Sequence, residues 1–143
     1  IKNTIHTLSN AMDVGSPSNF VRIMELYQND IDALKKDLVA YRFNDKQTSE
    51  IMRSVYADNN YLLDPHGAIG YLALKEYQLH HSGAKGIFTA TAHPIKFFDT
   101  VEQIVGHKPD LPSSISLLME KESKTVKMSP EYADLRSFLT QLT

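Results

Sequence analysis

Apolar side chains recur along most of the chain with the spacing of amphipathic helices. In the first such stretch they are Phe20, Ile23, Met24 and Tyr27. This i, i+3, i+4, i+7 pattern places them on one face of a helix. The pattern returns in stretches that open near residues 30, 44, 66, 93, 113 and 130, several of them behind a residue that favours the start of a helix. It therefore predicts a helix-rich chain. The expected helix-capping residues are Ser16, Asn44 and Ser113 or Ser114.

Between these stretches lie short runs that are rich in β-branched and aromatic residues. They predict strands at residues 4–8, 61–63 and 86–91, with a weaker candidate at 125–128. Strands that alternate with helices indicate an α/β fold, in which helices flank both faces of a mainly parallel sheet in three layers. At 143 residues the chain is long enough for one domain and too short for two ordinary ones. Residues 1–143 are therefore expected to have no internal domain boundary.

Three stretches share one layout, in which an apolar strand leads through a small polar loop into a capped helix. They span residues 5–20, 61–70 and 86–97. If their strands are parallel neighbours, the three loops open onto one edge of the sheet, where ligands of open α/β folds bind. The polar residues expected at this rim are Asp13, Ser16, Asn19, Asp64, His66, Thr89, Thr91 and His93. For any one of them, a local role in a turn or a helix cap is the alternative.

Composition excludes several other kinds of chemistry. Seventeen acidic and fifteen basic residues give a formal charge of −2, so nucleic acid is not an expected partner. Without cysteine the chain has no disulfide, thiolate metal site or cysteine nucleophile. The histidines lack the HExxH spacing of a zinc site, no serine has a GxSxG setting, and no apolar run is long enough to span a membrane. The chain opens with Ile-Lys-Asn rather than Met, so we expect it to be part of a larger protein.

Three motifs carry a family resemblance. AMDVGSPSNF (11–20), LDPHGAIGYLAL (63–74) and TATAHPIKF (89–97) together resemble the carboxyl-terminal part of threonine synthase, in its longer microbial and fungal branch. The resemblance implies a cytoplasmic pyridoxal 5'-phosphate enzyme of fold type II, the class of the tryptophan synthase β-subunit. Such an enzyme converts O-phosphohomoserine and water into threonine and phosphate.

The resemblance also implies which parts of the active site this chain holds. The family's Schiff-base lysine and its glycine-rich loop for the cofactor phosphate precede the resembled part, so no catalytic residue is expected here. We therefore expect the chain alone to be inactive and to need the amino-terminal remainder of the enzyme as its partner. The alternatives are a non-catalytic, threonine-synthase-like binding module and another fold-type-II lyase.

One cofactor contact transfers onto this sequence. In fold type II a Ser or Thr hydroxyl hydrogen-bonds the pyridine nitrogen, and the matching residue is Thr91, with Thr89 as its nearest rival. Asp64, His66 and His93 are expected at the rim of the active site without an assigned role. Because a helix N-terminus disfavours a protonated imidazole, His66 and His93 are expected to act as neutral hydrogen-bonding groups. Family members often have Thr at the position of Gly67.

Overall fold

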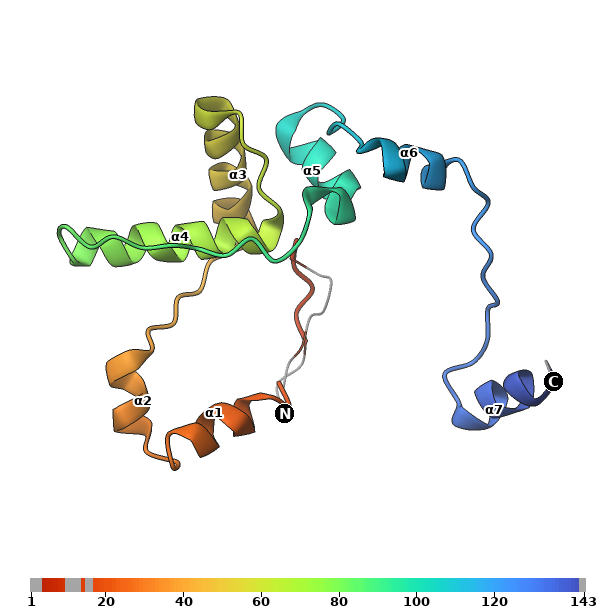
Figure 1. Ribbon diagram of the computed structural model, residues 1–143, viewed down its shortest axis with the longest axis horizontal. Helices are drawn as coiled ribbons and strands as arrows, with labels where there is room; N and C mark the ends of the chain where they lie inside the picture. Colours follow the sequence, from red (N-terminus) through yellow and green to blue (C-terminus); the bar gives the residue numbers. More distant parts are fainter. Residues whose placement is uncertain (1–3, 10–13, 15–16, 142–143) are drawn as a thin grey trace. The chain divides into compact units, whose positions relative to one another are not determined.

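The computed structural model describes residues 4–9, 14 and 17–141 of the chain, and it divides the chain into two compact units, Ile1–Pro109 and Asp110–Thr143. The first unit contains α1 (Phe20–Leu26), α2 (Ile31–Asp37), α3 (Asp45–Asn59), α4 (Pro65–His80), the 3₁₀ helix η2 (Pro94–Phe97) and α5 (Phe98–Val105). The second contains α6 (Ser113–Met119) and α7 (Tyr132–Gln141). Figure 1 shows the helices of both units, coloured along the chain. The absence of an internal domain boundary stays a prediction.

Every helical stretch predicted from the apolar spacing is a helix in the structure. The cap at Asn44 is confirmed, because its side chain accepts the Gln47 N–H at 3.0 Å while the Gln47 side chain accepts the Asn44 N–H at 3.0 Å. This reciprocal pair is a capping box, which satisfies two backbone donors at once. The helix then ends at Asn60, whose φ of 51° is left-handed.

Two predicted helix starts differ from the structure. Ser16 lies outside the described residues, and α1 begins only at Phe20, behind an Asn19 that accepts no capping hydrogen bond within the described chain. The predicted cap at Ser113 or Ser114 is wrong, since Ser113 is already the first helical residue and Pro112 occupies the capping position. The proline ring fixes the φ angle of the residue before the helix. The helix can therefore begin at Ser113 without a side-chain cap.

The buried core of the first unit lies where α3, α4, η2 and α5 meet. Its fully or nearly buried apolar residues are Met52, Val55, Leu63, Ala68, Phe97, Val101 and Ile104. The Arg53 Nε–H of α3 donates to the Ile104 carbonyl at 2.9 Å, which satisfies a carbonyl in the last turn of α5. The packing of these helices holds the residues before α4 and those of η2 next to each other.

No described residue forms a strand. The segment 86–91 is extended instead and returns along α4 (Figure 1), where the Phe88 ring meets the Tyr71 ring at 5.4 Å in an edge-on arrangement. Gly86 makes the close approach possible, since a Cβ there would overlap Leu74 Cδ1. A strand requires a hydrogen-bonded neighbour, and the described residues provide none for this segment. The helix-rich character is confirmed, and the parallel sheet stays a prediction.

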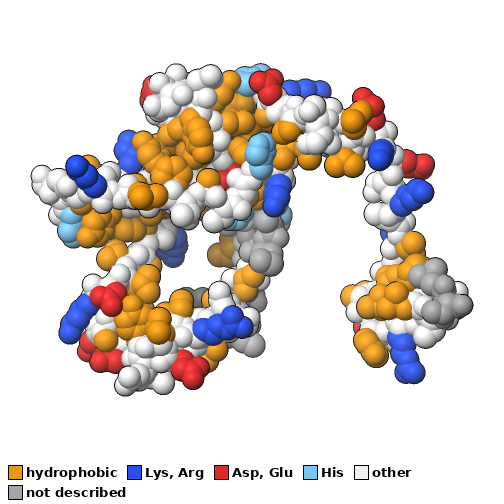
Figure 2. All heavy atoms as spheres, in the orientation of Figure 1, with side chains coloured by type: hydrophobic (Ala, Val, Ile, Leu, Met, Phe, Trp, Pro, Cys, Tyr) orange, Lys and Arg blue, Asp and Glu red, His pale blue; other side chains and the backbone are white. Residues whose placement is uncertain are grey.

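Several large apolar side chains of the first unit are exposed to solvent. Ile87, beside Phe88, is 94% exposed, Leu79 at the end of α4 is 76% exposed, and Tyr61 is 50% exposed. Figure 2 shows apolar side chains on the surface of this unit as well as between its helices. An apolar surface that is left uncovered is typical of a face that another protein part covers.

Candidate functional site

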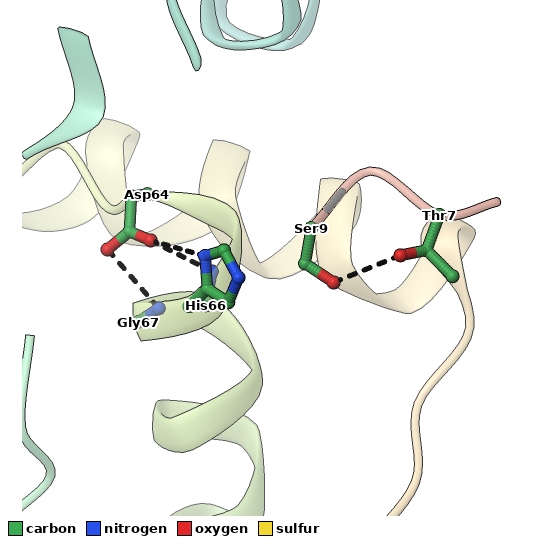
Figure 3. A network of polar contacts seen from close by, with 5 residues as sticks. All are labelled: Thr7, Ser9, Asp64, His66 and Gly67. Atoms are coloured by element: carbon green, nitrogen blue, oxygen red, sulfur yellow. Dashed lines mark hydrogen bonds and ion pairs between the residues drawn. The ribbon is translucent and has the colours of Figure 1, made fainter. Parts of the chain in front are cut away.

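The site centres on Asp64, which caps α4. One carboxylate oxygen, Oδ1, accepts the His66 N–H at 3.0 Å, and the other, Oδ2, accepts the Gly67 N–H at 3.3 Å (Figure 3). The local sequence explains the arrangement: Asp is a strong capping residue, and Pro65 has no N–H of its own and suits the first helical position. The Asp64 side chain is 1% exposed, so its charge is held away from water by these hydrogen bonds.

His66 adds a third contact to the same carboxylate. Its ring nitrogen Nδ1 lies 3.2 Å from Asp64 Oδ1, and its side chain stays 36% exposed. The His66 ring also meets the Phe97 ring, with centroids 5.2 Å apart. Phe97 is the last residue of the TATAHPIKF stretch, so this contact brings the second and third motifs together.

Gly67 leaves room for the close approach of the capping carboxylate. A Cβ at this position would lie 2.9 Å from Asp64 Oδ2, closer than a side-chain carbon normally comes to an oxygen. Any larger residue must therefore move the Asp64 carboxylate away from the N–H groups that it accepts.

We expect the free energy of unfolding of Gly67→Ala to be about 1 kcal/mol lower than that of Gly70→Ala, the usual value of a helix cap, because both substitutions gain the same helix preference of Ala. A urea titration followed by circular dichroism measures this change. Gly70→Ala is the matched control in the same helix, because its Cβ would meet Phe88 at an ordinary 3.8 Å. It should be neutral or stabilising, since Ala favours a helix more than Gly does. Equal losses in both variants would contradict the steric role of Gly67.

Three further residues of the predicted rim lie on the segment that leads into η2. Thr89, Thr91 and His93 are all exposed. Neither threonine hydroxyl has a hydrogen-bond partner within the described part of the chain, and His93 Nδ1 accepts the Ile95 N–H at 3.2 Å as the cap of η2. Accepting this bond requires a lone pair on Nδ1.

The predicted rim is therefore assembled in part. Asp64 and His66 contact each other, and His66 contacts Phe97, whereas no contact joins the two threonines to that pair among the described residues. Asp13 and Ser16 lie outside the described residues. Asn19 precedes α1 and makes no side-chain cap there. The contact between His66 and Phe97 was not predicted, because residues 66 and 97 become neighbours only through the packing of α3, α4 and α5.

Within the described ranges, no three His, Asp or Glu side chains gather closely enough to hold a metal ion. Likewise, no helix of that part of the chain is long and apolar enough to cross a membrane. What the site offers is hydrogen-bonding chemistry: a buried carboxylate, an oriented imidazole and two exposed hydroxyls.

A profile of the family described as "Threonine synthase, C-terminal" matches residues 67–139, just over half of the chain. The chain belongs to the threonine synthase family. Curated threonine synthases from Serratia marcescens and Escherichia coli K12 are 39% and 37% identical to it over 97% and 96% of its residues. These alignments cover 32% and 31% of the two relatives, so the chain spans about a third of their length.

Solved threonine synthase structures resemble the chain as well. The crystal structure of the Escherichia coli threonine synthase matches 99% of this chain with a TM-score of 0.85 at 36% identity, and the matched part is 32% of that enzyme. A threonine synthase from Brucella melitensis with bound pyridoxal phosphate matches 98% of the chain with a TM-score of 0.70 at 26% identity. The family predicted from three motifs is thus confirmed. The threonine synthase profile also reaches residue 139, far beyond the third motif.

Proposed function

We propose that this chain is the carboxyl-terminal part of a threonine synthase that converts O-phosphohomoserine and water into threonine and phosphate in the cytoplasm. The main support is the similarity to curated threonine synthases, which extends over 96–98% of the chain at 35–39% identity in five relatives. Similarity of this extent involves the whole chain and not only the three short motifs.

The cofactor in this proposal is pyridoxal phosphate, and the residues at hand fit one end of it. When bound, this group withdraws electrons from the carbon skeleton of an amino acid. The exposed Thr91 hydroxyl has no partner in the described part of the chain, and a hydroxyl is able to donate to a pyridine nitrogen. Because a hydroxyl is a much weaker acid than a carboxylic acid, Thr91 would hold the ring nitrogen without keeping it protonated. Thr89, two residues earlier in an extended segment, is on the same side of the backbone and is the alternative donor.

The proposal includes the parallel sheet that the sequence predicts. Residues 87–91 make no backbone hydrogen bond within the described chain, although they are extended and rich in β-branched side chains. Unpaired backbone donors and acceptors of this kind pair readily with a neighbouring strand. In the intact enzyme, the amino-terminal remainder would supply that strand, and the exposed Ile87 side chain would be covered by the same part.

A fusion protein tests the function directly. The first two thirds of the Escherichia coli enzyme, joined to this chain in place of its own carboxyl-terminal third, should release phosphate from O-phosphohomoserine and form threonine. This chain alone should release none, because we expect the cofactor lysine to lie in the other part. Phosphate release is measured by a coupled colorimetric assay, and threonine by chromatography.

Three outcomes separate the proposal from its alternatives. Activity of this chain alone would contradict the proposed division of the active site. A fusion that folds and binds pyridoxal phosphate but acts on a different amino acid would favour another fold-type-II lyase. A folded fusion with no activity on any tested amino acid would favour a non-catalytic, threonine-synthase-like binding module.

A further inference from the structure

The contact between Asp64 and His66 goes beyond what a helix cap needs. Capping α4 uses the backbone N–H groups of His66 and Gly67, and these occupy both carboxylate oxygens. The His66 Nδ1 atom nevertheless lies 3.2 Å from Oδ1 as an additional partner. The cap of α2 provides a comparison: Asp30 accepts the N–H groups of Asp32 and Ala33 at 2.9 and 3.0 Å, and the helix that follows, IDALKKD, contains no histidine.

The carboxylate determines which ring nitrogen of His66 carries the proton. An ionised carboxylate only accepts hydrogen bonds, so the Nδ1 atom that contacts it must be the donor. In the neutral ring this leaves Nε2 with its lone pair, and Nε2 has no hydrogen-bond partner among the described residues. A buried carboxylate beside an imidazole is a common way to select its tautomer.

Packing also limits how the ring turns. The Phe97 ring lies against it at 5.2 Å with an interplanar angle of 55°. In Figure 3 the Nε2 edge of His66 points away from Asp64, toward the side of the view where Thr7 and Ser9 are drawn. Those residues lead into the first motif of the sequence, and Leu8 between them packs against the core. Asp64 and Phe97 together fix the direction in which Nε2 points, and 36% of the His66 side chain remains exposed.

We propose that Asp64 is a positioning residue that fixes His66 in the Nδ1–H form, so that Nε2 accepts a hydrogen bond from the water molecule used in the reaction. The identity of the donor rests on the proposed function. The carboxylate and phosphate groups of O-phosphohomoserine accept hydrogen bonds and therefore do not donate to the Nε2 lone pair. Its amino group is the part of the substrate that pyridoxal phosphate would bind. Water is the remaining donor that the reaction consumes.

Nitrogen-15 NMR of the ring atoms tests the tautomer on the chain itself, without cofactor or substrate. At alkaline pH the wild-type chain should show His66 protonated at Nδ1 and unprotonated at Nε2. In Asp64→Ser the single hydroxyl still caps α4 but no longer holds Nδ1, and the Nε2–H form that a free imidazole prefers should dominate. Asp30→Ser, the matched loss of a capping carboxylate on α2, should leave the His66 signals unchanged.

The wild-type spectrum decides the tautomer even if Asp64→Ser fails to fold. An Nε2–H form in the wild-type chain would overturn the proposal, and so would an unchanged His66 tautomer in a folded Asp64→Ser variant. Circular dichroism shows whether the variant retains its helices.

Kinetics of the fusion enzyme test whether water is the donor to His66 Nε2. Asp64→Ser should lower kcat about tenfold, the effect of losing one hydrogen bond in the reacting state, with KM changed far less. A purely structural role would lower the amount of folded enzyme instead, and an unchanged kcat in folded enzyme would overturn the water-binding role. An inactive wild-type fusion would refute the proposed function and with it the water-binding role, whereas the tautomer measurement still decides what Asp64 does.

Discussion

Leu63→Ala is expected to lower the free energy of unfolding of the first unit by about 2–5 kcal/mol, the range for removing a large aliphatic side chain from a core. Leu63 is 2% exposed and belongs to the cluster formed by α3, α4 and α5. Its loss would leave a cavity directly before Asp64, between helices that hold the site together. Urea unfolding followed by circular dichroism measures the loss.

Leu79→Ala is the matched control, because it makes the same chemical change at a leucine of α4 that is 76% exposed. Exposed positions usually change stability by less than about 0.5 kcal/mol. A similar loss in both variants would show that the cluster around Leu63 is not the stabilising core of the unit.

Thr91→Val in the fusion enzyme is expected to change the absorption of bound pyridoxal phosphate and to lower kcat about fivefold, because a hydrogen bond of about 1 kcal/mol to the ring nitrogen is lost. Valine keeps the β-branched shape, and Thr91 is exposed in this chain, so the fold should be retained. Absorption spectra and initial rates on O-phosphohomoserine measure the two effects.

Thr89→Val is the comparison for this substitution, since it removes the same hydroxyl from the same exposed segment. We expect an unchanged spectrum and rate. If Thr89→Val shows the effects and Thr91→Val does not, the nitrogen contact belongs to Thr89. If neither variant shows them, the proposed cofactor contact is wrong.

The helices of this chain could be predicted from sequence because their signals are local. Asn44 and Asp64 bond to N–H groups only two or three residues away, and the apolar spacing of each helix is contained within the helix itself. The predicted cap at Ser113 or Ser114 was wrong because Pro112, whose ring restricts the backbone, occupies the capping position in place of a serine side chain.

The predicted strands depend on information that is not local. The segment 86–91 has the β-branched residues of a strand, yet its pairing depends on a neighbour that the described residues do not provide. The extended conformation follows from its own residues, whereas strand pairing requires a second chain segment.

The site was predictable to the extent that its parts are capping residues or belong to a motif. Asp64 and His66 stood out because they precede an apolar helix in a motif of the family. The contact of His66 with Phe97, and the crowding of the Asp64 carboxylate by a Cβ at position 67, depend on distances between atoms, which the order of residues does not contain.

Gly86 approaches Leu74 closely, although Leu74 lies in α4 and Gly86 lies in the segment that returns along this helix. Side-chain volume is shared between them: a methyl group added at 86 needs Leu74 to leave its rotamer or to become smaller. A larger residue at position 86 therefore fits only when the Leu74 side chain moves or is replaced by a smaller one. A protein engineer who wishes to stiffen the segment before Thr91 must redesign both residues together.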